Sequence, residues 1–322
     1  MPLKLTSFAT AATLSVSMIT GPCLTPAQAA EPVVVVGDSL NDTGTFAFST
    51  VTGRFTNTPG LLWTEIVASR VGGRADPARV HDGEAFINIG GTNWAQSGAL
   101  VADDGGLYNG LSQSVATQIT QALSSQIGPD TLVLMDGGGP DVLRTVMLVG
   151  AGEMAPEAAI ANVQTAARQL VNQAARIEAT GADVVLLNVG NFGVFPLLTG
   201  LGPDVASFAD QLSQAFNVAA AAQAQDIGLR AVQPDIYAWT EAVTGDPQAF
   251  GLQNATDPGC DLSQIEETPT RAGANCTLQD QIALDAANTH LFADDVHGSA
   301  ASHRLLAEYV MQAMSEAGLM GE

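Results

Sequence analysis

The stretch Val33-Val34-Val35-Val36-Gly37-Asp38-Ser39-Leu40 decides the fold and the place of the chemistry. Four β-branched residues in a row predict a strand that is covered on both faces, as in a parallel sheet. Gly37 ends this run, and Ser39 follows soon after it. Open parallel sheets bind ligands just beyond the carboxyl ends of their strands. Ser39 therefore lies where a reactive side chain is expected, although Asp-Ser after a strand is also common in ordinary turns and helix caps.

The rest of the chain alternates between short apolar runs and amphipathic stretches. Further strands are expected over residues 86–89, 131–135, 184–189 and 229–233, and helices over residues 61–71, 113–126, 156–180, 205–226 and 299–317. The helix at 156–180 has the clearest pattern, with apolar residues at Ile160, Val163, Ala167, Leu170, Ala174 and Ile177. Residues 244–280, rich in Gly, Pro, Asp and Asn, predict a long loop. Strands that each precede a helix favour an α/β fold with a parallel sheet between helices.

The composition indicates a folded and strongly acidic protein. The 322 residues are 46% hydrophobic and 14% charged, which excludes a disordered chain. Eleven Lys and Arg stand against 33 Asp and Glu, for a net charge of −22. Such a surface repels phosphate backbones and anionic membranes. Nucleic acid is therefore not an expected partner.

Residues 1–30 have the features of a secretory signal peptide. Lys4 precedes an uncharged stretch over residues 5–21, and the segment ends in Pro26-Ala27-Gln28-Ala29-Ala30. The apolar part is too short to span a membrane comfortably, so no stable membrane anchor is expected. We expect cleavage after Ala29 or Ala30, a secreted or periplasmic protein, and a single domain over residues 31–322.

Cys260 and Cys276 are the two cysteines that remain after such a cleavage. An even pair in an exported protein indicates a disulfide, which here would pin the long polar loop. The alternative is a metal site. That would need further Cys or His ligands at close spacing, and none lie there.

A serine hydroxyl needs an adjacent base, usually a histidine that a carboxylate orients. Asp294-Asp295-Val296-His297 stands just before the last expected helix. An acid three residues before a histidine can fold back across one turn to reach the ring, so Asp294 suits this role better than Asp295. The other histidines have no similarly placed acid, and we interpret them as ordinary surface or loop residues: His81, His290 and His303.

Together, Gly37-Asp38-Ser39-Leu40 and Asp294-x-x-His297 resemble the motifs of the GDSL esterases and lipases, in the SGNH hydrolase superfamily. Gly53-Arg54-Phe55-Thr56-Asn57, followed by Trp63, is similar to the second conserved segment of that family. Asn93-Trp94-Ala95-Gln96-Ser97-Gly98-Ala99 is similar to the segment whose glycine donates a backbone N–H to the oxyanion. The loop from Cys260 to Cys276 also looks like that of secreted members.

This resemblance implies a three-layer αβα sandwich with a flavodoxin-like parallel sheet. It also implies ester hydrolysis through an acyl-serine intermediate, without a metal or other cofactor. Ser39 would be the nucleophile, His297 the general base and acid, and Asp294 its orienting partner. The oxyanion hole would use the backbone N–H groups of Ser39 and Gly98. The expected substrate is a small-molecule or lipid ester, and no protein partner is implied.

One family feature is missing. The third conserved block is Gly-x-Asn-Asp, and its Asn side chain is a further oxyanion donor. Aligned on Asp141, the Asn position is Pro140, which has neither a side-chain donor nor a backbone N–H. Removing one such donor typically costs ~2.7–4 kcal/mol of transition-state stabilisation. The amides that could replace it are Asn41, Asn93 and Asn191.

Five other interpretations compete with this one. The α/β-hydrolases carry Gly-x-Ser-x-Gly, which is absent here, and Gly137-Gly138-Gly139 is not followed by the lysine of a phosphate loop. Asp103-Asp104 could bind calcium, but solvated acids are the simpler interpretation. Because of Pro140, an inactive binding protein on the same scaffold stays an alternative, as does a carbohydrate O-deacetylase.

An acyl ester is the favoured substrate because residues 190–202 are uncharged and could line an apolar pocket. Its large apolar residues could equally belong to the core: Phe192, Phe195, Leu197 and Leu198.

Overall fold

The computed structural model describes residues 32–51, 53–107, 110–265 and 273–320. The expected signal peptide at residues 1–30 lies outside them. Within these ranges, no helix is both long and apolar enough to cross a membrane.

The central sheet contains β1 (Val33–Val36), β4 (Leu132–Met135) and β5 (Asp183–Leu186), all parallel and in the order β1-β4-β5. Single parallel bridges extend both edges, from Val35 to Asn93 and from Val185 to Val232. Five segments therefore belong to the sheet, and in chain order they are β1, the segment at Asn93, β4, β5 and the segment at Val232. Across the sheet they follow the order 2-1-3-4-5, which is the flavodoxin-like order. This order confirms the expected fold class.

Two of the expected strands differ from the structure. Residues 86–89 supply β3 (Phe86–Asn88), which pairs antiparallel with β2 (Arg79–His81) in a separate hairpin. Ile87 is 47% exposed, so this run cannot be a strand that helices cover on both faces. Residues 229–233 form only the bridge at Val232. Neither run has the unbroken apolar sequence of β1 and β4, which are buried at every position: residues 86–89 include Asn88, and residues 229–233 include Arg230 and Gln233.

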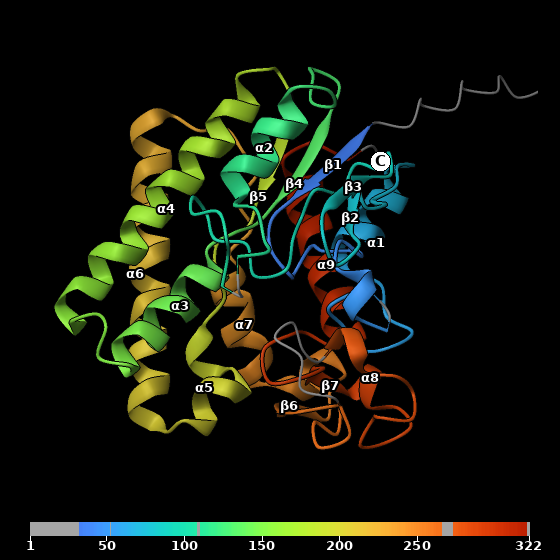
Figure 1. The fold of residues 1–322 in the computed structure, drawn as a ribbon, viewed down its shortest axis with the longest axis vertical. Helices are drawn as coiled ribbons and strands as arrows, with labels where there is room; N and C mark the ends of the chain where they lie inside the picture. Colours follow the sequence, from blue (N-terminus) through green and yellow to red (C-terminus); the bar gives the residue numbers. More distant parts are fainter. Residues whose placement is uncertain (1–31, 52, 108–109, 266–272, 321–322) are drawn as a thin grey trace, which may run out of the picture.

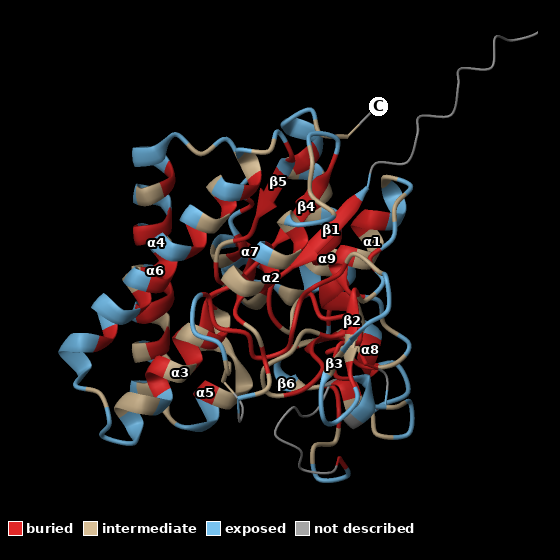
Figure 2. Cartoon of the chain, turned by 45° about the horizontal axis from the view of Figure 1, so that its top comes forward, coloured by how far each residue is buried: buried red, intermediate tan, exposed pale blue. Residues whose placement is uncertain are grey.

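Helices cover both faces of the sheet, which makes three layers (Figure 1). Val34 and Val36 point into a core shared with α2, α3, α4 and α6. Val33 and Val35 point the other way, into a core shared with α1, α7 and α9. Buried residues accordingly concentrate on the strands and on the helix sides that face them (Figure 2).

The helices expected from the sequence are present, with ends that differ by up to three residues. The helix expected at 205–226 is slightly longer in the structure and the other four are shorter, and further helices lie between them. The helices are α1 (Trp63–Arg70), α2 (Val115–Leu123), α3 (Gly139–Gly150), α4 (Pro156–Glu178), α5 (Pro196–Gly200), α6 (Pro203–Ile227), α7 (Ile236–Gly245), α8 (Ala286–Thr289) and α9 (Ala300–Glu316). In α4 the buried stripe begins at Ala159, and Ile160 is 42% exposed, which corrects its expected place in the core. Ala159 and Ile160 both lie about one turn before Val163, but the buried face runs through Ala159, Val163 and Ala166, so Ile160 lies at its edge.

The long polar segment contains β6 (Asn254–Pro258), which pairs with β7 (His290–Phe292) beside the last helix. Cys260 and Cys276 form a disulfide with their Cα atoms 6.1 Å apart, as the sequence predicts. Both cysteines are buried, and Ala293 packs against them. The disulfide therefore closes the loop between the two cysteines, and the Cys260 N–H donates to the Ala293 carbonyl at 3.0 Å, which holds the closed end beside the residue before Asp294.

Candidate active site

Ser39 lies in a tight turn directly after β1. Gly37 has φ of +144°, and a Cβ at this position would lie 1.6 Å from Asp136 Oδ1, so no larger residue fits. The buried Gln118 of α2 clamps this glycine from both sides. Its Oε1 accepts the Gly37 N–H at 2.9 Å and its Nε2 donates to the Gly37 carbonyl at 2.9 Å. The turn that presents Ser39 is therefore held rigidly at the end of the sheet.

The structure brings Ser39, His297 and Asp294 together from opposite ends of the chain. Ser39 Oγ is 3.0 Å from His297 Nε2, across 258 positions of sequence. His297 Nδ1 is 2.7 Å from Asp294 Oδ2, and Asp294 Oδ1 accepts the backbone N–H groups of Val296 and His297 at 2.7 and 2.6 Å. With Nδ1–H donated to Asp294, the lone pair of Nε2 faces the serine hydroxyl. This is the geometry of a general base beside a nucleophile.

Electrostatics favour this arrangement. Burial alone would lower the pKa of His297, but the charge and hydrogen bond of Asp294 outweigh it, so the pKa is raised above its usual value. Burial alone would raise the pKa of Asp294, but the nearby imidazole and the hydrogen bonds hold the pKa below its usual value. Asp294 therefore stays ionised, and its negative charge would stabilise a protonated His297.

Two backbone N–H groups are free beside the serine. Among the described residues, the N–H groups of Ser39 and Gly98 have no protein acceptor. Both residues line one cavity, and Gly98 has φ of +74°, which favours glycine. The neighbouring turn is fixed by Asp42, whose carboxylate accepts the N–H of Ser97 at 2.9 Å. Two such donors could receive the negative oxygen of a tetrahedral intermediate.

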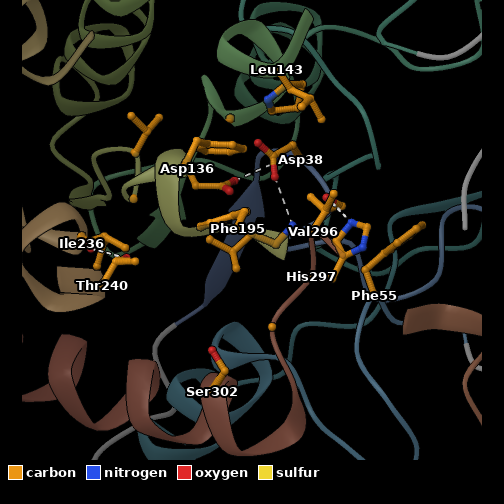
Figure 3. Close-up of a pocket in the computed structure, with 18 of the residues that line it drawn as sticks. Asp38, Phe55, Asp136, Leu143, Phe195, Ile236, Thr240, Val296, His297 and Ser302 are labelled. Carbon is orange, nitrogen blue, oxygen red and sulfur yellow. Dashed lines mark hydrogen bonds between the residues drawn. The ribbon is translucent and has the colours of Figure 1, made fainter. Parts of the chain in front are cut away.

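The cavity has a volume of about 1090 Å³, including its open mouth. Figure 3 shows residues from both ends of the chain meeting around it, with Asp38 and Asp136 at one end and His297 beside Phe55. Phe192 and Phe195 line it with stacked rings 4.5 Å apart, whereas Leu197 and Leu198 are not part of its wall. Most of its other lining side chains are apolar: Leu40, Phe55, Leu107, Leu143, Ile236, Trp239, Leu291, Phe292, Val296 and Leu306.

Within the described ranges, no group of three or more His, Cys, Asp or Glu side chains could hold a metal ion.

A family model described as GDSL-like lipase/acylhydrolase matches residues 33–310. The chain belongs to this family. Members of the GDSL family generally hydrolyse esters. Among curated proteins, no match was found.

Solved structures similar to this GDSL-family chain are hydrolases. TesA is 18% identical with a TM-score of 0.42, and the match covers 89% of this chain and 99% of TesA. An extracellular lipase from Streptomyces rimosus is 16% identical with a TM-score of 0.42, covering 89% of this chain and 100% of the lipase. Est24, a carbohydrate acetylesterase from Sinorhizobium meliloti, is 16% identical with a TM-score of 0.41, covering 90% of this chain and 100% of Est24. Likenesses at these levels do not distinguish one ester from another.

At the position of the family's oxyanion Asn, Pro140 is buried in the first turn of α3 and lines the cavity. Proline fits there because the first N–H groups of a helix have no partner within it. The next residue, Asp141, accepts the Val101 N–H at 3.0 Å, and burial raises the pKa of Asp141 to about 7. On the alignment to Asp141 made from the sequence, Pro140 keeps a helical backbone at this position and offers no amide donor.

None of the three inspected asparagines replaces that donor. Asn41 Nδ2 donates to the Val36 carbonyl and to Asp136, at 2.9 and 2.8 Å. Asn93 Nδ2 donates to the Asn41 carbonyl at 2.7 Å, and Asn191 Nδ2 donates to Glu241 at 2.7 Å. Each amide is thus committed to structure elsewhere.

The remaining histidines are buried, so their interpretation as surface residues is wrong. His303 is 1% exposed; its Nδ1 accepts the Trp63 N–H at 3.2 Å, and burial lowers its pKa to about 3. His81 is 6% exposed and packs against Phe86, and His290 is 8% exposed. A neutral imidazole can be buried at modest cost when one nitrogen is hydrogen-bonded, and residue type alone does not show this.

The sequence analysis did not identify three polar residues that hold the site: Gln118, Asp42 and Asp136. Gln118 reaches Gly37 across 81 positions, and Asp136 reaches the Asp38 N–H across 98 positions. Asp42 lies only three residues after Ser39 in the sequence, but its role depends on its hydrogen bond with the Ser97 N–H. The sequence did contain one signal for Asp136: it directly follows a buried apolar run, much as Asp38 follows the run at 33–36 after Gly37.

Proposed function

We propose that the protein is a secreted serine esterase that hydrolyses acyl esters through an acyl-serine intermediate. The observation that carries this is the Ser39 hydroxyl 3.0 Å from His297 Nε2, with Asp294 behind the ring. The free N–H groups of Ser39 and Gly98 on the same cavity support it. Export is supported by the signal-like residues 1–30 and by a disulfide, which persists in oxidising compartments.

The reaction has two parts. Ser39 Oγ attacks the ester carbonyl while its proton moves to His297 Nε2, and the carbonyl electrons become an oxyanion held by the two N–H groups. Collapse of this intermediate breaks the bond to the alcohol oxygen, which takes the proton from His297. Water then attacks the acyl-serine in the same way. It gives a proton to His297, and the carboxylic acid leaves as Ser39 recovers its hydrogen.

The apolar cavity supports an acyl chain as the bound group. Phe192, Phe195 and Trp239 bury apolar area, and each CH₂ that enters such a wall contributes ~0.8 kcal/mol. A carbohydrate deacetylase would need hydrogen-bonding side chains for sugar hydroxyls, and these are few on the walls. The acyl side is therefore expected to determine selectivity.

A series of p-nitrophenyl esters from acetate to dodecanoate tests this proposal. The wild type should hydrolyse them, with kcat/KM rising with chain length until the cavity is filled, and Ser39→Ala should lose the activity. Equal rates for the two proteins would end the catalytic assignment. A preference for acetate would favour the deacetylase.

The second candidate is a binding protein on an inactive scaffold, which Pro140 favours. A fluorophosphonate reacts with an activated serine irrespective of the acyl chain. Labelling of Ser39 supports the enzyme, while an unlabelled Ser39 in folded protein supports the binding protein.

A further inference from the structure

Two carboxyl groups meet under the turn that carries Ser39. Asp38 follows β1 and Asp136 follows β4, so both lie at the carboxyl edge of adjacent parallel strands. Each is 5% exposed, and each lines the cavity at the end shown in Figure 3. A pair of buried acids beside a nucleophile has no place in the reaction steps above, so it requires its own explanation.

The hydrogen bonds of Asp136 converge on the turn. Its Oδ1 accepts the Asp38 N–H at 3.1 Å and the Asn41 side-chain amide at 2.8 Å. Asp38 Oδ1 in turn accepts the Leu40 N–H at 3.0 Å. These bonds fix the residues before and after Ser39, and with them the direction of its N–H and its hydroxyl.

Within the part of the chain that the structure describes, no Lys or Arg side chain forms an ion pair with Asp38 or Asp136. Two neutral amides face the pair, Gln118 of α2 and Asn41 of the turn. The other facing groups are Asp141 of α3, which is another acid, and His297, whose Nδ1 is already hydrogen-bonded to Asp294. Arg144 of α3 makes its ion pair with the exposed Asp103 instead. Burial, and then the charge of Asp38, raise the pKa of Asp136 well above its usual value. Two like charges this close and this buried cannot both be retained.

We propose that Asp136 is a positioning residue: it remains a neutral carboxylic acid, donates its one proton to the Asp38 carboxylate, and thereby fixes the turn that presents Ser39. Its Oδ1 already accepts two N–H groups, so the proton resides on Oδ2. This inference rests on the proposed function for its catalytic consequence, but the protonation state stands independently of any activity.

Charge provides the first test, without substrate. Asp136→Asn keeps an acceptor for the two N–H groups and a donor for Asp38, and it cannot ionise. Native capillary electrophoresis at pH 7 should give this variant the mobility of the wild type, because the pair carries one negative charge in both. Asp130→Asn, at an exposed site, is the matched control and should shift mobility by one charge. A shift of Asp136→Asn equal to that of the control would show two ionised carboxylates and overturn the proposal.

Kinetics provide the second test. Asp136→Ala removes the acceptor of two hydrogen bonds that hold the turn, and kcat should fall on the order of tenfold or more while KM changes little. Asp136→Asn should recover most of that loss. At an alkaline pH Asp136 should ionise, and the wild type should then migrate with one more negative charge than Asp136→Asn. At that same pH the kcat of the wild type should fall, while Asp136→Asn, which cannot ionise, should keep its kcat. Asp141→Asn, which removes the other buried acid of this group, should retain that alkaline loss.

The outcomes separate the two proposals. If the wild type hydrolyses no ester while the mobility result holds, the proposed function fails and the protonation state stands. Equal kcat and equal pH profiles for the wild type, Asp136→Asn and Asp136→Ala would leave no positioning role for Asp136. A lower melting temperature of Asp136→Ala without any change in kcat at a temperature where it is folded would also overturn the role.

Discussion

Pro140→Asn is expected to raise kcat by roughly a hundredfold. Pro140 lines the cavity at the place of the family's amide donor, and no inspected asparagine supplies a substitute. One oxyanion donor contributes ~2.7–4 kcal/mol, or roughly a hundred- to thousandfold in kcat. The donor acts on charge that develops in the transition state, so KM should change little. Because proline restricts the unfolded chain, the variant should also lose ~0.4–1 kcal/mol of stability.

The assay is steady-state hydrolysis of the p-nitrophenyl ester that the wild type cleaves best, with thermal unfolding measured alongside. Pro140→Ala is the matched control, because it restores the backbone N–H of α3 without adding an amide side chain. A gain in Pro140→Asn alone assigns the effect to the amide. A folded Pro140→Asn that is no faster than the wild type would refute the missing-donor argument and show that two backbone donors suffice around Pro140.

Three further predictions concern the base, the loop and the turn. His297 acts as a neutral imidazole and its pKa is raised, so kcat/KM should fall with decreasing pH through a value above the ordinary ~6.5; a flat pH profile between 5 and 8 would exclude it as base. Replacing Cys260 and Cys276 by Ser opens a loop of 16 residues and should cost ~3 kcal/mol in urea unfolding, and no change in midpoint would contradict this. Gly37→Ala should abolish activity and lower the melting temperature, because its Cβ would meet Asp136; an active, stable variant would show that the turn can relax.

The central strands were predictable because helices cover both of their faces. Val33–Val36 and Leu132–Met135 are buried at every position, which demands unbroken apolar sequence. The apolar run at 86–89 has a similar composition but forms a surface hairpin with Ile87 exposed. Whether such a run enters the central sheet or a surface hairpin depends on the strand with which it pairs. A local sequence pattern does not show which strand that is. The expected strand at 229–233 does supply the outer segment at Val232, although only as a single bridge, whereas the segment at Asn93 on the opposite edge was not among the expected strands.

The reactive groups of the site were easier to identify than their supports. Ser39 and His297 stand in short motifs whose chemistry requires those residue types, and the structure places their side chains 3.0 Å apart. Gln118 and Asp136 act through hydrogen bonds that span 81 and 98 positions, so their roles depend on the completed fold. A buried polar side chain must find partners, but the sequence does not show which ones.

The missing amide and the buried carboxyl pair affect the same chemical event. The N–H donors of Ser39 and Gly98 and the carboxyl groups of Asp38 and Asp136 line the same cavity, so an oxyanion that forms at Ser39 develops its charge near both. A second ionised carboxylate there would repel the developing charge in a site with little water to screen it. With one donor fewer than its family pattern, the site depends more strongly on keeping Asp136 neutral. Pro140→Asn should therefore reduce the alkaline loss of kcat that ionisation of Asp136 causes in the wild type, and an equal alkaline loss in the two proteins would show that the amide donor and the protonation of Asp136 act independently.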